Sequence, residues 1–169
     1  MKRVLLTGLS GVGKSTVTGA LAARGYKAVD ADCDEYSAWV EVSGDTSALG
    51  SPDWGNRDWL WREDRIRDLL ATEDAEVLFL AGSAANMGAF LPRFDHIILL
   101  SAPREVIAER LCTRTTNAYG KDPAELARAL ELVVTVEPLL RRAAGHEIDT
   151  SAPLAEVVAR VLQVAGEQS

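Results

Sequence analysis

A glycine-rich run near the amino terminus carries the clearest chemical signal in the sequence. It reads Gly8-Leu-Ser-Gly-Val-Gly-Lys14-Ser15, followed by Thr16, and it fits the pattern G-x-x-x-x-G-K-[ST] at every fixed position. Glycines at this spacing allow the backbone to turn its N–H groups inward, into a concave nest that holds phosphate oxygens. A helix that begins at the end of the run adds the positive end of its dipole. The pattern therefore indicates a binding site for a nucleoside triphosphate.

The residues around this run support the same interpretation. Lys14 would place a mobile ammonium on the terminal phosphates, and the Ser15 hydroxyl is a ligand for Mg²⁺. The apolar run Arg3–Thr7 precedes the glycines, and a segment with Val17 and Leu21 on one side follows them. The alternative, a chance glycine-rich turn, does not explain this order of strand, loop and helix. The predicted nucleotide-binding residues of the run are Gly8, Ser10, Gly11, Val12, Gly13, Lys14, Ser15 and Thr16.

Two carboxylates after the next apolar run are candidates for metal and acid–base chemistry. The run Lys27–Asp30 is followed by Asp32, and side chains two residues apart in an extended segment point the same way. One of these two acids would hold a magnesium-bound water, while the other would accept a proton from a substrate hydroxyl. The alternative is that acids here cap the following helix, which we prefer for Asp34 and Glu35. The predicted metal-binding residues are Ser15, Asp30 and Asp32.

The elements that position these residues follow an alternating pattern. Short apolar runs alternate with helical patterns, which is typical of an α/β fold with a parallel sheet. The expected strands are Arg3–Thr7, Lys27–Asp30, Glu76–Ala81, His96–Leu100 and Glu147–Asp149. The expected helices span about residues 14–24, 57–71, 103–114, 122–143 and 153–164. The polar stretch 43–56 is expected to be a long loop, and all four tryptophans fall in or beside it, at positions Trp39, Trp54, Trp59 and Trp61.

The composition is that of an ordinary globular domain with an acidic surface. The 169 residues are 47% hydrophobic and 25% charged, and the formal net charge is −7. A field of that sign repels nucleic acid and anionic membranes, so neither is an expected partner. Cys33 and Cys112 form no metal or disulfide framework, which favours the reducing cytoplasm. We expect one domain, residues 1–169, in a cytoplasmic monomer or homodimer.

These features resemble the small-molecule and nucleotide kinases of the adenylate kinase and shikimate kinase type. The resemblance covers essentially the whole chain. It rests on the glycine-rich phosphate-binding run at residues 8–15, known as a P-loop, on Asp30-Ala-Asp32 and on the spacing of Arg110 and Arg114. It implies the P-loop NTPase fold, a three-layer sandwich whose five-stranded parallel sheet has the order 2-3-1-4-5. It also implies ATP and Mg²⁺ as cofactors, a substrate-binding segment at about 33–71 and a short lid at about 110–121.

The resemblance also assigns residues to the nucleotide from the second half of the chain. Arg110 and Arg114 are one helical turn apart and face the same way, so both would close from the lid over ATP. The alternative is a solvated helix face paired with Glu109. The segment Asp149-Thr150-Ser-Ala-Pro153 resembles the loop that edges the adenine, so Thr150 and Pro153 are predicted to bind the nucleotide. The predicted catalytic residues are Lys14, Asp32, Arg110 and Arg114.

The segment expected to bind the second substrate resembles shikimate kinases less closely. Trp61-Arg62-Glu-Asp-Arg is similar to their Phe-Arg-x-x-Glu string, and Arg62 falls within the inward stripe of the helix expected at 57–71. Arg62 therefore either contacts the substrate or forms an internal ion pair with Asp32 or Glu63. Trp59 is expected in the core, while Trp54 is predicted to stack on a flat or sugar-like acceptor.

Two further departures concern the charge and shape of the acceptor pocket. Gly82-Ser83-Ala-Ala-Asn stands where shikimate kinases have three glycines beside the acceptor, and only Gly82 is retained. Glu137-Pro-Leu stands where they have Arg-Pro-Leu, whose arginine binds the substrate carboxylate. Glu137 would repel a carboxylate, which favours a neutral or cationic acceptor and disfavours shikimate. The alternative is that Glu137 merely pairs with Arg141, one turn along the helix. Gly82, Ser83 and Glu137 join Asp32, Trp54 and Arg62 as predicted substrate-binding residues.

The sequence as a whole favours an ATP-dependent small-molecule kinase. It would transfer the γ-phosphoryl group of ATP to a hydroxyl or phosphate of a nucleotide, nucleoside, sugar or amine-bearing compound. The alternative is a nucleotide-binding regulatory protein or slow ATPase without a dedicated acceptor. A regulator would not need a polar, Trp-lined second pocket beside the acids, so we favour the kinase.

Overall fold

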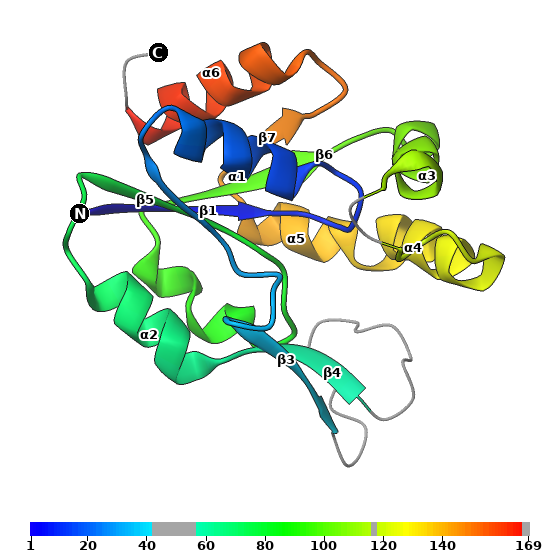
Figure 1. Ribbon diagram of the computed structural model, residues 1–169, viewed down its shortest axis with the longest axis horizontal. Coiled ribbons are helices and arrows are strands. Elements are labelled where there is room, and N and C mark those ends of the chain that lie inside the picture. Colours follow the sequence, from blue (N-terminus) through cyan, green and yellow to red (C-terminus); the bar gives the residue numbers. More distant parts are fainter. Residues whose placement is uncertain (42–56, 116–117, 167–169) are drawn as a thin grey trace.

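Five parallel strands form the central sheet of the structure, a computed structural model that describes residues 1–41, 57–115 and 118–166 (Figure 1). The strands are β1 (Lys2–Thr7), β2 (Lys27–Asp30), β5 (Val77–Ala81), β6 (His96–Ser101) and β7 (His146–Asp149). Their order in the sheet is β2-β5-β1-β6-β7. Numbered along the sequence, this is the predicted order 2-3-1-4-5, so the predicted fold class is confirmed.

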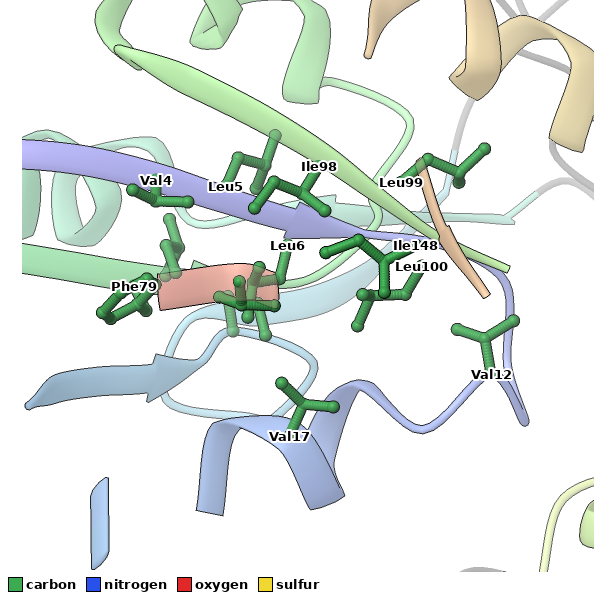
Figure 2. Close-up of a cluster of buried hydrophobic side chains, with 14 of the residues drawn as sticks. Val4, Leu5, Leu6, Val12, Val17, Phe79, Ile98, Leu99, Leu100 and Ile148 are labelled. Carbon is green, nitrogen blue, oxygen red and sulfur yellow. The ribbon is translucent and has the colours of Figure 1, made fainter. Parts of the chain in front are cut away.

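The strands are nearly continuous apolar runs because helices cover both faces of the sheet. Val4, Leu5 and Leu6 of β1 have no exposed surface, and neither do Phe79 of β5 and Ile98 of β6. Figure 2 shows these side chains gathered on and around the neighbouring strands. This close-packed layer holds the carboxyl ends of the strands in place, and those ends carry the candidate site.

The helices form one layer on each side of the sheet and a group beyond its end (Figure 1). One face is covered by α1 (Lys14–Ala23) and α6 (Leu154–Ala165). The other face is covered by α2 (Glu63–Ala71), α5 (Glu137–Ala143) and the short 3-10 helices η1 (Met87–Ala89) and η2 (Leu91–Arg93). Beyond the carboxyl end of β1 lie α3 (Arg104–Thr113) and α4 (Pro123–Thr135). None of the helices in the described ranges is long and apolar enough to span a bilayer.

The helix predicted at 57–71 is wrong in its first part. Residues 57–61 form a strand, β4 (Arg57–Trp61), which pairs antiparallel with β3 (Ser37–Glu41), and α2 begins only at Glu63. Trp39 lies directly opposite Trp59 in this hairpin, and aromatic pairs of this kind stabilise antiparallel strands. Pairing between distant segments therefore overrode the helical periodicity. The expected loop at 43–56, with Trp54, lies outside the described residues.

The single helix predicted at 122–143 is two helices. The chain leaves regular helix at Val136, between α4 and α5. Pro138 lies in the first turn of α5, and a proline lacks the N–H that a continuous helix would need at that position. The break lies between two helices that line the same cavity, α4 through Leu132 and α5 through Leu139 and Leu140.

Candidate active site

The loop between β1 and α1 has the backbone geometry that its glycines predict. Gly13 precedes α1 in the left-handed region, with φ of 95°, which favours glycine. Gly8 packs against the end of β6, where a Cβ atom would clash with the Leu100 carbonyl oxygen and lie 2.8 Å from Val12 Cγ2. The loop is thus pressed against the neighbouring strand, and the first turn of α1 lies directly behind it.

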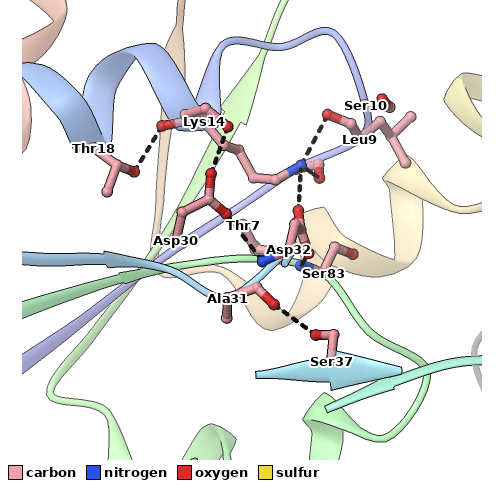
Figure 3. Close-up of polar contacts among 12 residues, drawn as sticks. Thr7, Leu9, Ser10, Lys14, Thr18, Asp30, Ala31, Asp32, Ser37 and Ser83 are labelled. Carbon is pink, nitrogen blue, oxygen red and sulfur yellow. Dashed lines mark hydrogen bonds and ion pairs between the residues drawn. The ribbon is translucent and has the colours of Figure 1, made fainter. Parts of the chain in front are cut away.

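Lys14 bridges the glycine-rich loop and the acids that follow β2. Its Nζ donates to the carbonyl oxygens of Gly8 at 2.7 Å and of Leu9 at 3.2 Å. The same atom lies 3.4 Å from Asp32 Oδ2, as Figure 3 shows. The Lys14 side chain is 9% exposed, so this ammonium is a largely buried positive charge held against the loop. Such a charge attracts a phosphate strongly because little water screens it.

The two predicted acids have different partners. Asp30 Oδ2 accepts a hydrogen bond from Ser15 Oγ at 2.5 Å, and Asp30 Oδ1 accepts one from the Asp32 backbone N–H at 3.0 Å. Asp32 Oδ1 instead accepts from the Ser83 backbone N–H at 3.2 Å, while its Oδ2 faces Lys14. Asp30 is therefore tied to Ser15 in the first turn of α1, whereas Asp32 lies between Lys14 and the loop after β5.

The donors at this place fit a magnesium ion that is held mainly by a nucleotide. Within the described ranges, no group of three or more His, Cys, Asp or Glu residues is arranged to hold a metal. Mg²⁺ does not need such a cage, because it is usually bound by one or two protein oxygens, several waters and substrate phosphates. The Ser15 hydroxyl and the Asp30 carboxylate offer two such oxygens beside the phosphate loop.

Arg110 connects three segments behind the loop. Its guanidinium donates to the Thr150 hydroxyl at 2.9 Å and to the Thr150 carbonyl at 2.7 Å, and it also reaches the Val12 carbonyl at 3.3 Å. The buried Thr150 hydroxyl donates to the same Val12 carbonyl at 2.6 Å. These contacts place both predicted residues against the glycine-rich loop, with Arg110 in the last turn of α3.

Arg114 lies nearer the mouth of the loop. Its guanidinium lies 3.5 Å from Ser10 Oγ and donates to the Tyr119 carbonyl at 2.8 Å. Within the described part of the chain, its buried Nε has no hydrogen-bond partner. Burial lowers the pKa of the Arg114 guanidinium below its ordinary value, because water is removed from around the charge. A phosphate at the loop would restore the lost electrostatic stabilisation.

A cavity of about 1180 Å³ joins these groups to a second, mainly apolar space. What we call the phosphate-loop half is lined by residues 8–11 and 13–17, Arg110, Thr113, Arg114, Tyr119, Thr150, Ala152, Leu154 and Val157. What we call the hairpin half is lined by Asp32, Trp39, Trp59, Ser83, Ala84, Ala85, Met87, Leu132, Val136, Leu139 and Leu140. The contact between Lys14 and Asp32 lies where the two halves meet.

Hydrogen bonds at its base fix the hairpin beside the acids. The buried Ser37 hydroxyl donates to the Ala31 carbonyl at 2.6 Å, next to Asp32 (Figure 3). At the other strand, the Asn86 side-chain amide accepts from the Trp61 backbone N–H at 2.8 Å and donates to the Trp61 carbonyl at 3.0 Å. The hairpin is therefore attached to the loop that carries Asp32 and to the loop after β5. These two attachments set the position of its tryptophans.

Two predicted substrate-binding residues have other partners in the structure. Arg62 precedes α2, so its predicted place on an inward helical stripe is wrong; its Nε donates to the Asp34 carbonyl at 3.0 Å. Glu63 pairs with Arg67, not with Arg62. Glu137 is buried at the start of α5 and its Oε1 accepts a hydrogen bond from Arg141 at 2.8 Å, so the ion pair of the alternative interpretation is present. Its buried Oε2 has no hydrogen-bond partner among the described residues.

Other predicted residues lie beside the cavity without lining it. Gly82 lies behind Asp32, where a Cβ atom would be 3.2 Å from Trp61 Nε1 and 3.3 Å from Asp32 Oδ1. Because Gly82 has no side chain, the Trp61 indole and the Asp32 carboxylate can both lie close to its backbone. Val12 is buried beneath the loop, and Pro153 precedes the first residue of α6. Trp54 lies outside the described residues.

Sequence reasoning missed most of the hairpin half. Trp39 was unassigned, and Trp59, expected in the core, is half-buried and also lines the cavity. Ser37–Glu41 and Arg57–Trp61 contain tryptophan and valine residues, which are enriched in strands, and this composition was the available signal. The apolar residues of α4 and α5, such as Leu139, carry no signal that distinguishes cavity lining from core.

The sheet order and the phosphate loop together define a P-loop protein with the architecture of a small-molecule kinase. A family model described as "AAA domain" matches residues 4–131, which run from β1 into α4. The chain belongs to this family.

Comparison with individual proteins gives the same class. Shikimate kinase 2 of Yersinia enterocolitica is 26% identical over 178 residues, covering 98% of this chain and 96% of that protein. The shikimate kinase of Acinetobacter baumannii in complex with shikimate superposes with a TM-score of 0.64 at 19% identity, covering 97% of this chain and 92% of the other. A gluconokinase from Sinorhizobium meliloti superposes with a TM-score of 0.55 at 19% identity, covering 98% and 91%. The predicted resemblance to kinases of the adenylate kinase and shikimate kinase type, and the prediction of a small-molecule kinase, are confirmed.

Proposed function

We propose that the protein transfers the γ-phosphoryl group of ATP to a hydroxyl group of a small molecule. The observation that supports this most directly is the position of Asp32. Its Oδ2 lies 3.4 Å from Lys14 Nζ, and its side chain lines the cavity where the phosphate-loop half meets the hairpin half. A carboxylate between a phosphate site and a second pocket is suited to receive the proton of an attacking hydroxyl.

The phosphate-loop half would bind ATP through the backbone N–H groups of the loop and the Lys14 ammonium. Ser15 and Asp30 would hold the Mg²⁺ ion, which neutralises charge on the phosphate oxygens when it is bound. Arg110 keeps the Thr150 segment against the loop, which makes it a positioning residue. Arg114, beside Ser10, would donate to the transferred group as negative charge develops there.

Asp32 would act on the acceptor. The Ser83 backbone N–H holds its Oδ1, and Oδ2, which faces Lys14, would orient the acceptor hydroxyl and take its proton. As the new oxygen–phosphorus bond forms, the bond to the β-phosphate oxygen breaks and ADP leaves. In this geometry, the protein supplies positioning and electrostatic stabilisation, which account for most of phosphoryl-transfer catalysis.

The charges around the cavity favour an acceptor without a carboxylate. Among the described lining residues, the cationic side chains are Lys14, Arg110 and Arg114, and all three contact the phosphate loop. Glu137 stands where shikimate kinases have a carboxylate-binding arginine, and it is paired with Arg141. A carboxylate on the acceptor would therefore compete with the ATP phosphates for these three cationic side chains. We propose a neutral or cationic acceptor rather than shikimate.

A screen for acceptor-dependent release of ADP tests this function. Hydroxyl compounds of several classes, with shikimate among them, are compared with a water-only background for the wild type and for Asp32→Asn. We expect at least one acceptor to raise turnover about 10²-fold above background in the wild type only. Background hydrolysis across the whole panel, equal in the two proteins, would instead indicate a slow ATPase or a nucleotide-binding regulator.

A further inference from the structure

The hairpin half of the cavity has a composition that indicates what kind of molecule it accepts. We propose that the acceptor is an uncharged hydroxyl compound whose body is a flat apolar ring system, bound against Trp59 and Trp39. This inference rests on the proposed kinase function and adds the chemical class of its second substrate. It is carried by the tryptophan face of the hairpin, by the small number of polar side chains among the described residues around it, and by the size of those residues.

The tryptophan face follows from the register of the hairpin. Trp39 and Trp59 are directly opposite each other, so their side chains leave the same side of the two strands. Their ring centroids are 5.2 Å apart with an angle of 56° between the planes. Both rings line the cavity; Trp59 is half-buried, and 46% of the Trp39 surface is exposed. Two such rings form a broad apolar surface of fixed shape.

The face is held rigidly because its base is part of the core. Trp61 is on the same side of β4 as Trp59 and is 2% exposed, packed against Phe90 with ring centroids 5.8 Å apart. The Ala85 backbone N–H donates to the Trp59 carbonyl at 3.0 Å, which ties the strand to the loop that carries Ser83. A preformed surface of this kind binds a rigid ring at a low cost in conformational entropy.

Few of the described residues in this half carry polar side chains. Oxygen-bearing side chains among them are those of Asp32 and Ser83. Against these residues a polyhydroxylated acceptor would find few partners for its hydroxyls, and each unpaired group weakens binding. Asp32 is reserved for the reacting hydroxyl, so the site suits a molecule with one or two hydroxyls.

The remaining lining residues match an apolar ring in character and size. Ala84 and Ala85 carry single methyl groups and leave width beside the tryptophans, while Leu139 and Leu140 of α5 add branched apolar surface. Aromatic side chains with small and aliphatic neighbours form the usual lining of sites for flat apolar ligands. The reacting hydroxyl would then reach Asp32, and the ring would remain in the hairpin half.

Direct binding to the ADP-bound protein tests the proposed class. Ethanol, benzyl alcohol and naphthalenemethanol share one primary hydroxyl and differ in their rings, and glycerol, gluconate and shikimate supply the polar comparison. Calorimetric titration should show affinity rising by about tenfold or more with each ring, because each adds apolar surface to bury. Trp59→Leu should weaken binding of naphthalenemethanol about tenfold. Val40→Ala, on the other side of the same hairpin, is the matched control and should not weaken it.

The outcomes separate this inference from the kinase function. Equal or tighter binding of glycerol, gluconate or shikimate, or unchanged binding in Trp59→Leu, would overturn the ring-bearing class even where ATP-dependent transfer is found. Ring-dependent binding that Trp59→Leu weakens would support the class, and phosphate transfer to the bound alcohol is then measured separately. Binding of the aryl alcohol without any transfer to it would contradict the kinase function and leave the ligand class intact.

Discussion

The two halves of the cavity are built in opposite ways. The phosphate-loop half is made largely from one short segment, residues 8–17, which includes Lys14. The hairpin half is assembled from the β3–β4 hairpin, the loop after β5, and the adjoining parts of α4 and α5. Phosphate-binding geometry that is common to many proteins is thus encoded locally, whereas the proposed acceptor site depends on distant segments that must fold together.

The charges differ between the halves as well. Lys14, Arg110 and Arg114 all contact the phosphate loop, and the described lining of the hairpin half is mainly aromatic and aliphatic. Asp32 is the residue that both halves share. A clear separation follows: changes in one half should alter the use of ATP, changes in the other should alter the use of the acceptor, and Asp32 should couple the two.

Asp32→Asn should produce the largest change. Without a carboxylate to take the hydroxyl proton, acceptor-dependent turnover should fall about 10³-fold, while ATP affinity stays within a few fold. Initial rates and nucleotide titration of the same preparation measure the two effects. Asp34→Asn, at an exposed neighbouring position, is the matched control. If Asp32→Asn loses the native near-ultraviolet circular dichroism instead, the role of Asp32 is structural.

Lys14→Ala should affect ATP itself, whatever the acceptor. Removing the buried ammonium should lower turnover by roughly 10²-fold or more, and it should lower background hydrolysis with it. Lys27→Ala, which removes a surface ammonium paired with Asp74, should leave both rates unchanged. Near-normal turnover of Lys14→Ala would exclude the phosphate loop from the mechanism.

Two glycine substitutions test how closely the phosphate loop is packed. Gly8→Ala would place a methyl group against the Leu100 carbonyl and should destabilise the fold by about 2 kcal/mol or more. Gly19→Ala, in α1, meets no atom within 4 Å and should stabilise the helix by about 0.5–1 kcal/mol. Urea unfolding compares the two variants. Equal effects would contradict the packing of Gly8 described here.

The smallest effect concerns the pH dependence of stability near α5, which carries Leu139 and Leu140 of the hairpin half. Hydrogen bonds from Arg141, at 2.9 and 3.0 Å, hold the pKa of Glu147 below its ordinary value of 4.5. A lowered folded pKa stabilises the protein above about pH 4.5, and that stabilisation is lost as pH falls through the folded pKa.

Glu147→Gln should therefore lower the melting temperature slightly at neutral pH and give a shallower loss of stability in acid. Because the Glu147 side chain is partly exposed, solvent screening keeps the difference small. Melting temperatures measured from pH 3 to 7 give the two curves, which should converge at the acidic end. Glu131→Gln, at an exposed position of α4, should keep the wild-type slope; an unchanged slope in Glu147→Gln would contradict the assignment.

The strand order was expected only because of the resemblance to known kinases, whereas the residues themselves were sufficient to predict the phosphate loop and the buried strands. Each of these depends on residues close together in the chain, or on apolar runs whose burial follows from their composition. Lys14 directly follows Gly13 and is the first residue of α1, so the local backbone alone places its side chain at the loop. Local covalent geometry leaves few alternatives at such positions.

Tertiary structure alone decided the hairpin half. Trp59 shares a helical stripe with Ile66 when the chain is read by itself, yet pairing with Trp39 makes its segment a strand. Arg62 and Glu137 had two open interpretations each, and their partners, the Asp34 carbonyl and Arg141, became known only from the folded chain. The physical reason is that side chains such as those of Trp59 and Arg62 contact segments that are distant in the sequence. No local sequence pattern indicates which distant segment will pack against them.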